Sequence, residues 1–168
     1  EVLILEGEVS DYENSREEGL AFRGNINGRT GYAYTEQLTE DAIAYLVETA
    51  KENAALLSPE DCEELYAGEE SYPELEGVNA ALEKLRVEEK INAAMRMETA
   101  ALAGAEEVAS LDYCALGTSL AEVVIRNTRG LDVSFAKNFA TAYVSAIAKK
   151  GGETKTGSYF WKAQDWND

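Results

Sequence analysis

The side chains that could do acid–base, nucleophilic or metal chemistry are of few kinds: two cysteines and thirty-two carboxylates, with no histidine. The lack of imidazole excludes Ser–His and Cys–His pairs for nucleophilic catalysis. Asp61 and Glu63 flank Cys62, and their negative charges disfavour a reactive thiolate. Cys114 lies among strand-forming residues and is predicted to be a core residue. Two thiols so far apart suit neither a zinc site nor a disulfide framework, so we expect free thiols.

The carboxylates are densest in "SPEDCEELYAGEESYPELEGV", which runs from Ser58 to Val78 and holds eight acids, no bases and both prolines. A calcium or magnesium loop needs carboxylates at fixed short spacings, and no such spacing occurs among the six acids concerned: Glu60, Asp61, Glu63, Glu64, Glu69 and Glu70. We therefore expect a solvated acidic linker with at most one turn of helix. No catalytic, cofactor-binding or metal-ligating residue is predicted anywhere in the chain. An enzyme that uses carboxylates alone stays an open, weaker alternative.

The stretch "GLAFRGNINGRTGYAYT" holds four glycines and could be a phosphate loop or a hairpin. A phosphate-binding glycine loop leads into a helix N-terminus, whereas these glycines lie within and between strand-like runs. Asn27 and Gly28 are the residues that a type I′ turn favours, because both of its central positions need positive φ. We therefore predict a structural hairpin.

This turn predicts a register with the following pairs: Ile26 with Arg29, Phe22 with Ala33, Leu20 with Thr35, Arg23 with Tyr32, and Gly24 with Gly31. One face, led by Leu20, Phe22, Ile26 and Ala33, is apolar and directed to the core. The glycine pair marks a place where a backbone or another chain can approach closely.

Aromatic side chains gather near the end of the chain: Tyr159, Phe160, Trp161 and Trp166. Such side chains can stack on nucleic-acid bases. The formal net charge of −17, however, repels nucleic acid and anionic membranes. We expect these aromatics to pack on a surface that this chain lacks, such as a further domain or a partner.

The charge is unevenly distributed along the sequence. Residues 1–119 carry twenty-seven acidic and eight basic side chains, whereas residues 120–168 carry five and seven. The later part is therefore better suited to lie against an acidic surface. No run approaches the roughly 18 apolar residues of a membrane-spanning helix. The first residues do not have the basic-then-apolar pattern of a signal peptide. Because the chain begins with Glu1 and not with Met, we expect a fragment of a longer protein.

The pattern of the first half predicts strands and then a helix. "EVLILEGE" and "VSDYENS" are expected to be strands ahead of the hairpin. Thr39 is expected to cap a helix whose apolar positions follow helical spacing: Ile43, Leu46, Val47, Ala50, Ala54 and Leu57.

The second half reverses that order. A helix with Ile91, Ala94, Met95 and Leu102 on its apolar face ends near Gly104, and "VASLDYCAL" and "LAEVVIRN" are expected strands. Residues 131–149 fit either a strand or a helix by periodicity; we predict a strand that bends or bulges near Asn138. Lys149–Gly152 then connects it to a return strand, "ETKTGSYFWKAQDW".

These elements predict an α+β fold, mostly an antiparallel β-sheet with two main helices packed on one face, in two βα-type halves. The expected subdomains are 1–57, with two strands, the hairpin and the first helix, and 79–168, with the second helix and its strands. Residues 58–78 are the acidic linker between them.

Several motifs together resemble the TldD/PmbA family. "GLAFR", "GRTGYAYT" and "EQLTEDAIAYLVETAKENA" are similar to its first domain, and "VEEKINAAMRMETAALAG" to the helix that opens its central domain. "VVIRNTRGLDVSFAKNFATAYVSAIAKKGGETKTGSYFWKAQDW" resembles its strand–Asn-x-x-Gly–strand region, and this closing part is more similar to PmbA members, also called TldE, than to TldD. The resemblance covers nearly the whole chain.

The resemblance implies a cytoplasmic protein of the family of DNA gyrase modulators and zinc metallopeptidases, which is linked to microcin maturation and antitoxin degradation. The family works as a TldD–TldE pair that encloses a chamber, where an unfolded peptide is held by main-chain pairing. Zinc binds an HExxxH helix of TldD, beyond the region that this chain resembles. Since this chain has no histidine, no catalytic or metal-binding residue carries over.

We therefore expect the non-catalytic N-terminal scaffold and peptide-gripping part of a metallopeptidase subunit that acts in proteolysis and peptide maturation. Its expected partners are a paralogous or identical subunit, as a dimer, and an unfolded peptide, with no nucleic acid and no membrane. No cofactor is expected in these residues; zinc is possible in the parent assembly. The alternative is an acidic protein-interaction module that mimics DNA and acts on gyrase.

Overall fold

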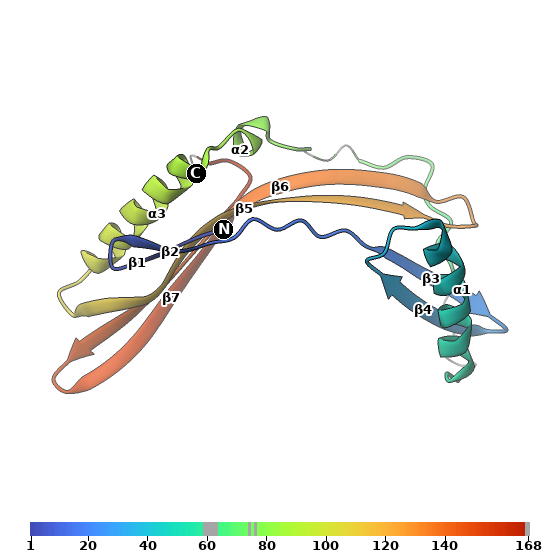
Figure 1. The fold of residues 1–168 in the computed structure, drawn as a ribbon, viewed down its shortest axis with the longest axis horizontal. Helices are drawn as coiled ribbons and strands as arrows, with labels where there is room; N and C mark the ends of the chain where they lie inside the picture. The colour runs from blue at the N-terminus through green and yellow to red at the C-terminus, as the bar shows by residue number, and fades with distance from the viewer. Residues whose placement is uncertain (59–63, 74, 76, 167–168) are drawn as a thin grey trace. The chain divides into compact units, whose positions relative to one another are not determined.

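A computed structural model describes residues 1–58, 64–73, 75 and 77–166 (Figure 1). Its elements follow in this order: β1 Val2–Leu5, β2 Glu8–Tyr12, β3 Leu20–Ile26, β4 Arg29–Thr35, α1 Glu40–Ala55, α2 Ala80–Glu83, α3 Val87–Leu102, β5 Val108–Arg126, β6 Asp132–Lys150 and β7 Glu153–Ala163. They form a five-stranded sheet of order β2-β1-β5-β6-β7 and a two-stranded sheet, β3-β4. The expected α+β fold is confirmed.

The chain forms two compact units. One comprises Glu1–Asn14, Ser71–Ile125 and Val133–Asp168, and the other Ser15–Glu70 and Arg126–Asp132. The expected subdomain 1–57 thus contributes residues to both, because Val2 and Leu3 pair with β5 across Leu116 and Ala115. In the described part of the acidic stretch 58–78 there is no helix or strand.

The β3–β4 hairpin has the predicted register, from Leu20 opposite Thr35 to Ile26 opposite Arg29. Asn27 and Gly28, with φ of 53° and 79°, form the turn, and the Asn25 side chain accepts a hydrogen bond from the Gly28 amide. Both central residues lie in the left-handed region that a type I′ turn requires. Local sequence therefore sets this hairpin.

Helix α1 packs on one face of the hairpin, where Leu46 and Ala50 contact Ala33 and Phe22. The predicted glycine pair is used here, since a Cβ on Gly31 would lie 1.8 Å from the Ala50 carbonyl oxygen. The close approach is therefore made by the chain's own helix. Thr39 is the N-cap residue as expected, but its side chain makes no capping hydrogen bond.

The second core lies between α3 and the five-stranded sheet. Its buried residues are Val2 and Ile4 of β1, Ala94 of α3 and Leu116 of β5. Glu98 of α3 is also buried, and its carboxylate accepts a 2.9 Å hydrogen bond from the Gly7 amide in the β1–β2 turn. Burial of this carboxylate requires such a partner, and the contact ties the turn to the helix.

A buried amide anchors the segment that leads into α2. Asn138 of β6 accepts a hydrogen bond from the Asn79 amide and donates one to the Asn79 carbonyl, both at 2.8 Å. The Asn79 side chain in turn donates to the Gln164 carbonyl and caps α2. The bend that we predicted near Asn138 stays a prediction, whereas the prediction of a strand over 131–149 is confirmed by β6. The two strands expected over 108–127 form the single strand β5.

The packing of α1 generates a stability prediction. Gly31→Ala places a methyl group against the backbone of α1, and overpacking of this kind costs about 2–3 kcal/mol in the free energy of unfolding. Urea unfolding monitored by circular dichroism measures the loss. Gly157→Ala on β7 is the matched control, since its Cβ meets nothing within 4 Å. Equal unfolding of the Gly31→Ala variant and the wild type would contradict the packing.

Candidate functional site

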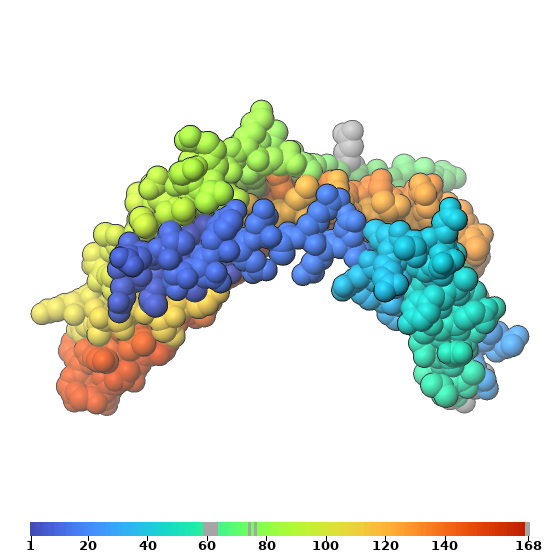
Figure 2. All heavy atoms as spheres, in the orientation of Figure 1, coloured from blue at the N-terminus to red at the C-terminus, as the bar shows by residue number. Residues whose placement is uncertain are grey.

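Strand β7, with eleven residues, forms one edge of the five-stranded sheet, and the five-residue strand β2 forms the other. Strand β7 pairs with β6 without interruption, from Lys150 opposite Glu153 to Ala140 opposite Ala163. Gly151 and Gly152 form the two-residue turn, both with positive φ. The predicted hairpin connection is therefore confirmed, and its end lies at the surface in the space-filling view (Figure 2).

The register shows which backbone groups of β7 point away from the sheet. The Lys149 amide donates a 2.8 Å hydrogen bond to the Glu107 carbonyl, on the side of β6 away from β7. Lys149 and Thr154 are therefore a pair without mutual hydrogen bonds, and such pairs alternate along an antiparallel ladder. The β7 residues whose backbone amide and carbonyl groups point away from β6 are therefore every second residue, namely Thr154, Thr156, Ser158, Phe160 and Lys162. Among the described residues, no strand pairs with this edge.

An apolar hollow of about 290 Å³ lies on the face of β6 and β7 that α3 partly covers. Its lining residues are Met97 of α3, Ala142 and Val144 of β6, and Tyr159 and Trp161 of β7. Ala142 stands opposite Trp161, and Val144 opposite Tyr159. The small β6 side chains thus leave room between the two rings and the helix.

The opposite face of the same strands carries aromatic rings and a cation. The Lys162 ammonium lies 3.5 Å from the centroid of the Phe139 ring, in a cation–π contact. Tyr113 and Tyr143 meet edge to face with centroids 5.6 Å apart. The negative charge of Glu1 raises the pKa of Tyr113, so this phenol stays protonated at neutral pH. Phe160, opposite Tyr143, is exposed.

The β6–β7 hairpin is a basic strip in an acidic chain. Between Asp132 and Ala163 there are five lysines and two carboxylates, against a net charge of −17 for the whole chain. Lys150 pairs with Glu107, and its hydrogen bond lowers the pKa of that carboxyl. Lys155 lies 3.5 Å from Glu153. Carboxylates therefore offset the charge of two of the five lysines in this hairpin.

The cysteine and lysine nearest the core are held in unreactive settings. Cys114 is buried, as predicted, with its Sγ 3.7 Å from the Ala94 carbonyl oxygen. Burial, and then the charge of Glu98, raises its pKa to about 11. Lys90 donates a 2.6 Å hydrogen bond to the Thr118 hydroxyl, and burial lowers its pKa. The charge of Glu98 disfavours the Cys114 thiolate, and the lowered pKa of Lys90 reflects its burial.

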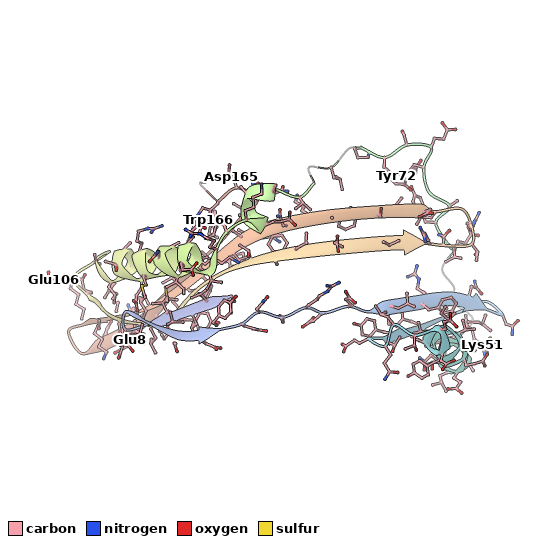
Figure 3. All side chains as sticks on the ribbon, turned by 45° about the horizontal axis from the view of Figure 1, so that its top comes forward. Glu8, Lys51, Tyr72, Glu106, Asp165 and Trp166 are labelled. Atoms are coloured by element: carbon pink, nitrogen blue, oxygen red, sulfur yellow. The ribbon has the colours of Figure 1, made fainter. Side chains whose placement is uncertain are left out.

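The aromatic cluster predicted near the end of the chain is only partly directed outward. Tyr159 and Phe160 are 68% and 58% exposed, and Trp161 is half-buried. Trp166, labelled in Figure 3, packs against the chain's own core of Val2, Ile4, Ala94 and Leu116, so the expectation that it packs on a surface that this chain lacks is wrong for this residue. That expectation failed because sequence spacing does not show where α3 lies.

Sequence reasoning also missed the apolar hollow. The available signal was a run of small residues at alternate positions of β6: Ala140, Ala142, Ala146 and Ala148. Alternate residues of a strand share a face, so this run predicts a shallow face. The pairing of β6 with Tyr159 and Trp161 then supplies the walls.

The described residues contain no group of three or more acidic or cysteine side chains placed to hold a metal ion. Glu60, Asp61, Cys62 and Glu63 lie outside the described residues. Among the described helices, none is both long and apolar enough to span a membrane.

Two domain models of one protein family match the chain. PmbA/TldA metallopeptidase domain 1 matches residues 1–54, and the PmbA/TldA metallopeptidase central domain matches residues 81–168. No curated protein matches the chain.

Several solved structures share the fold. A Thermotoga maritima protein described as a proposed modulator of a DNA gyrase is 23% identical, with a TM-score of 0.78 over 99% of this chain and 37% of its own. TldE from Thermococcus kodakarensis is 22% identical, with a TM-score of 0.76 over 99% of this chain and 38% of its own. A Bacteroides thetaiotaomicron protein, also described as a proposed modulator of DNA gyrase, is 18% identical, with a TM-score of 0.75 over 90% and 36%. The chain thus spans little more than a third of their length.

The buried thiol generates a pH prediction. Because the folded-state pKa of Cys114 lies near 11, above the ordinary value of 9.0, the protonated thiol favours the folded state. This stabilisation is complete below pH 9 and is lost as the pH rises through 11. The stability advantage of the wild type over Cys114→Ala, measured by urea unfolding, should therefore shrink between pH 9 and pH 11. An advantage that is constant over this range would contradict the assignment.

Proposed function

The chain belongs to the TldD/PmbA family of metallopeptidases, and from that premise we propose that it is the non-catalytic N-terminal part of a peptidase subunit, which binds an unfolded peptide along the edge of β7. The single observation that carries this proposal is the edge of β7, with its row of outward amide and carbonyl groups. An extended peptide can pair with such an edge as an additional strand.

The β3–β4 sheet is a weaker candidate for peptide pairing. Its Gly31 is covered by α1, and the Asn53 side chain donates a 2.8 Å hydrogen bond to the Tyr32 carbonyl. Hydrogen-bonded and non-hydrogen-bonded pairs alternate from the turn outward, beginning with the hydrogen-bonded pair Ile26–Arg29. Arg23–Tyr32 is therefore a non-hydrogen-bonded pair, and the Tyr32 carbonyl points away from β3. The helix therefore occupies a backbone group that an added strand would need.

The donor set of the residues that the structure describes does not fit a catalytic zinc ion, since no three acidic or cysteine side chains among them are placed to hold one metal. A catalytic zinc takes three nitrogen, sulfur or carboxylate ligands on one site, and this chain has no imidazole and a buried thiol with a raised pKa. We propose that zinc and the hydrolytic step belong to the rest of the parent assembly, in the cytoplasm, with a paralogous or identical subunit. This chain's own residues then bind and align the peptide.

A backbone substitution tests the peptide-binding edge. Ser158→Pro removes an outward amide without removing a hydrogen bond to β6, so the fold is retained while peptide pairing is lost. Fluorescence anisotropy with a labelled unfolded peptide should show binding to the wild type and at least tenfold weaker binding to Ser158→Pro. Ser158→Ala is the matched control and should bind like the wild type.

The same samples test the non-catalytic assignment. Chromatography of the peptide after incubation, with and without zinc, should return it intact. Zinc-dependent cleavage by this chain alone would refute the assignment, and equal binding by Ser158→Pro would refute the edge.

An acidic module that mimics DNA is the competing proposal. It is favoured by the twenty-seven acids of residues 1–119 and by the names of two structural relatives as modulators of DNA gyrase. If it holds, the chain binds purified gyrase at low salt, and the affinity falls steeply as ionic strength rises. Surface plasmon resonance across a salt series measures this, and absence of binding at low salt removes the proposal.

A further inference from the structure

We propose that Asn27 is a site of spontaneous deamidation, and that the side chain of Asn25 protects it by holding the backbone amide that would attack it. The site is the turn of the β3–β4 hairpin, so it does not depend on peptide binding at β7. Three features of the turn carry the proposal: the sequence Asn27–Gly28, the exposure of Asn27, and the hydrogen bond from Gly28 to Asn25.

The sequence places a reactive pair at this turn. Of the nine asparagines in the chain, Asn27 alone precedes a glycine. Deamidation begins when the backbone nitrogen of the following residue attacks the side-chain amide, and a glycine at that position has no Cβ to hinder the approach. Gly28, which the turn needs for its positive φ, is therefore also the residue that makes Asn27 reactive.

The reaction needs only hydroxide and water as co-reactants. The Gly28 amide gives its proton to hydroxide, its nitrogen bonds to Cγ of Asn27, and the side-chain nitrogen leaves as ammonia with a proton from water. Water then opens the resulting succinimide ring at either carbonyl and leaves aspartate or isoaspartate. Asn27 is exposed, and a Cβ on Gly28 would meet nothing within 4 Å, so both co-reactants reach the turn.

The folded turn opposes ring closure in two ways. The Gly28 amide donates a 3.0 Å hydrogen bond to Oδ1 of Asn25, which holds both its proton and its direction. The ring also needs the Gly28 nitrogen and Cγ of Asn27 on the same side of the Asn27 Cα–C bond, whereas the ψ of about +30° in a type I′ turn directs that nitrogen away from the side chain. Rotation about this bond moves the Gly28 amide away from Asn25, so attack proceeds from an opened turn.

The two products have different effects on the hairpin. Aspartate suits a type I′ turn as well as asparagine does. Isoaspartate adds one carbon to the backbone of the turn, so the two-residue loop that sets the register from Ile26–Arg29 onward is lost. Because α1 packs on Phe22 and Ala33 of this hairpin, isoaspartate formed at Asn27 loosens the packing of the helix.

Peptide mapping by mass spectrometry tests the site and its protection. The chain is incubated at mildly alkaline pH, either folded or in concentrated urea, and the peptide that contains Asn27 is followed for the mass gain of an amide-to-acid change. Enzymatic methylation of isoaspartyl groups identifies that isomer. Conversion should be roughly tenfold slower, or more, in the folded chain than in urea, because the folded turn must first open.

The turn at Asn127 is an internal control in the same map. Its side chain accepts hydrogen bonds from the Arg129 and Leu131 amides, and the residue that follows it is Thr128. The Cβ of a threonine hinders the attack that a glycine permits. The peptide with Asn127 should therefore convert more slowly than the peptide with Asn27 in urea.

Substitutions separate the hydrogen bond from the local sequence. Asn25→Ala removes the acceptor and should speed conversion in the folded chain by roughly three- to tenfold, the range for one ordinary hydrogen bond. Asn25→Asp keeps an oxygen acceptor and should convert at close to the wild-type rate. In urea, where the turn is absent, both variants should convert like the wild type. Asn27→Gly keeps a turn sequence that the hairpin favours and has no amide to lose.

The outcomes decide the site and its protection separately. If Asn27 stays intact even in urea, the deamidation site is wrong. If the folded and unfolded chains convert equally fast, or if folded Asn25→Ala converts as slowly as the wild type, protection by Asn25 is wrong. Acceleration by Asn25→Ala in urea as well would trace the effect to local sequence and also overturn the protection. An aged wild-type sample rich in isoaspartate should unfold at lower urea than before ageing, whereas Asn27→Gly should be unchanged; equal unfolding of both would refute the effect on α1.

Discussion

The two-glycine turn between β6 and β7 fixes which residues of this eleven-pair ladder exchange hydrogen bonds, and that pattern decides which backbone groups of β7 point away from the sheet. With Lys150 and Glu153 next to the turn and the Lys149 amide bonded to Glu107, alternate residues of β7 must direct their amides and carbonyls away from β6. A shift by one residue would exchange the two faces, turning Tyr159 and Trp161 away from α3. A single turn thus sets which backbone groups and which side chains β7 presents.

The positions of α1 and α3 explain why the two sheets differ in how many of their edge backbone groups stay unpaired. In the β3–β4 unit, Gly31 lets the backbone of α1 pack closely on one face of the hairpin. The Asn53 side chain of α1 also donates a hydrogen bond to the outward Tyr32 carbonyl, which leaves one fewer unpaired group on that edge. In the larger unit, α3 is held over β1 and β5 by Val2, Ile4 and Leu116, and no strand in the described part of the chain pairs with the outer edge of β7. Proteins usually protect free edges because they recruit other strands. An unprotected edge of eleven residues is therefore consistent with a role in pairing.

Acidic and basic residues are unevenly distributed along this chain, and its buried thiol is held in the protonated form. The acids lie mostly in residues 1–119, whereas the segment from Asp132 to Ala163 has five lysines and two carboxylates. Burial and the charge of Glu98 keep the Cys114 thiol protonated, and its Sγ lies 3.7 Å from the Ala94 carbonyl oxygen. Aromatic side chains such as Tyr159 and Trp161 line the hollow beside β7, and the polar groups along its outer edge are backbone amides and carbonyls.

The sequence by itself determined what depends on neighbours in the chain. Asn27–Gly28 and Gly151–Gly152 specified two hairpins and, for the first, the complete register, because only a few residues accept the positive φ of a two-residue turn. Helical periodicity located α1 and α3, and the order of motifs indicated the family. Tertiary structure alone decided that β1 pairs with β5, that Trp166 packs against the core beneath α3, and that a hollow opens between Met97 and Trp161. These features depend on contacts between residues far apart in sequence, and alternation or helical spacing within one segment carries no information about which distant segment will cover it.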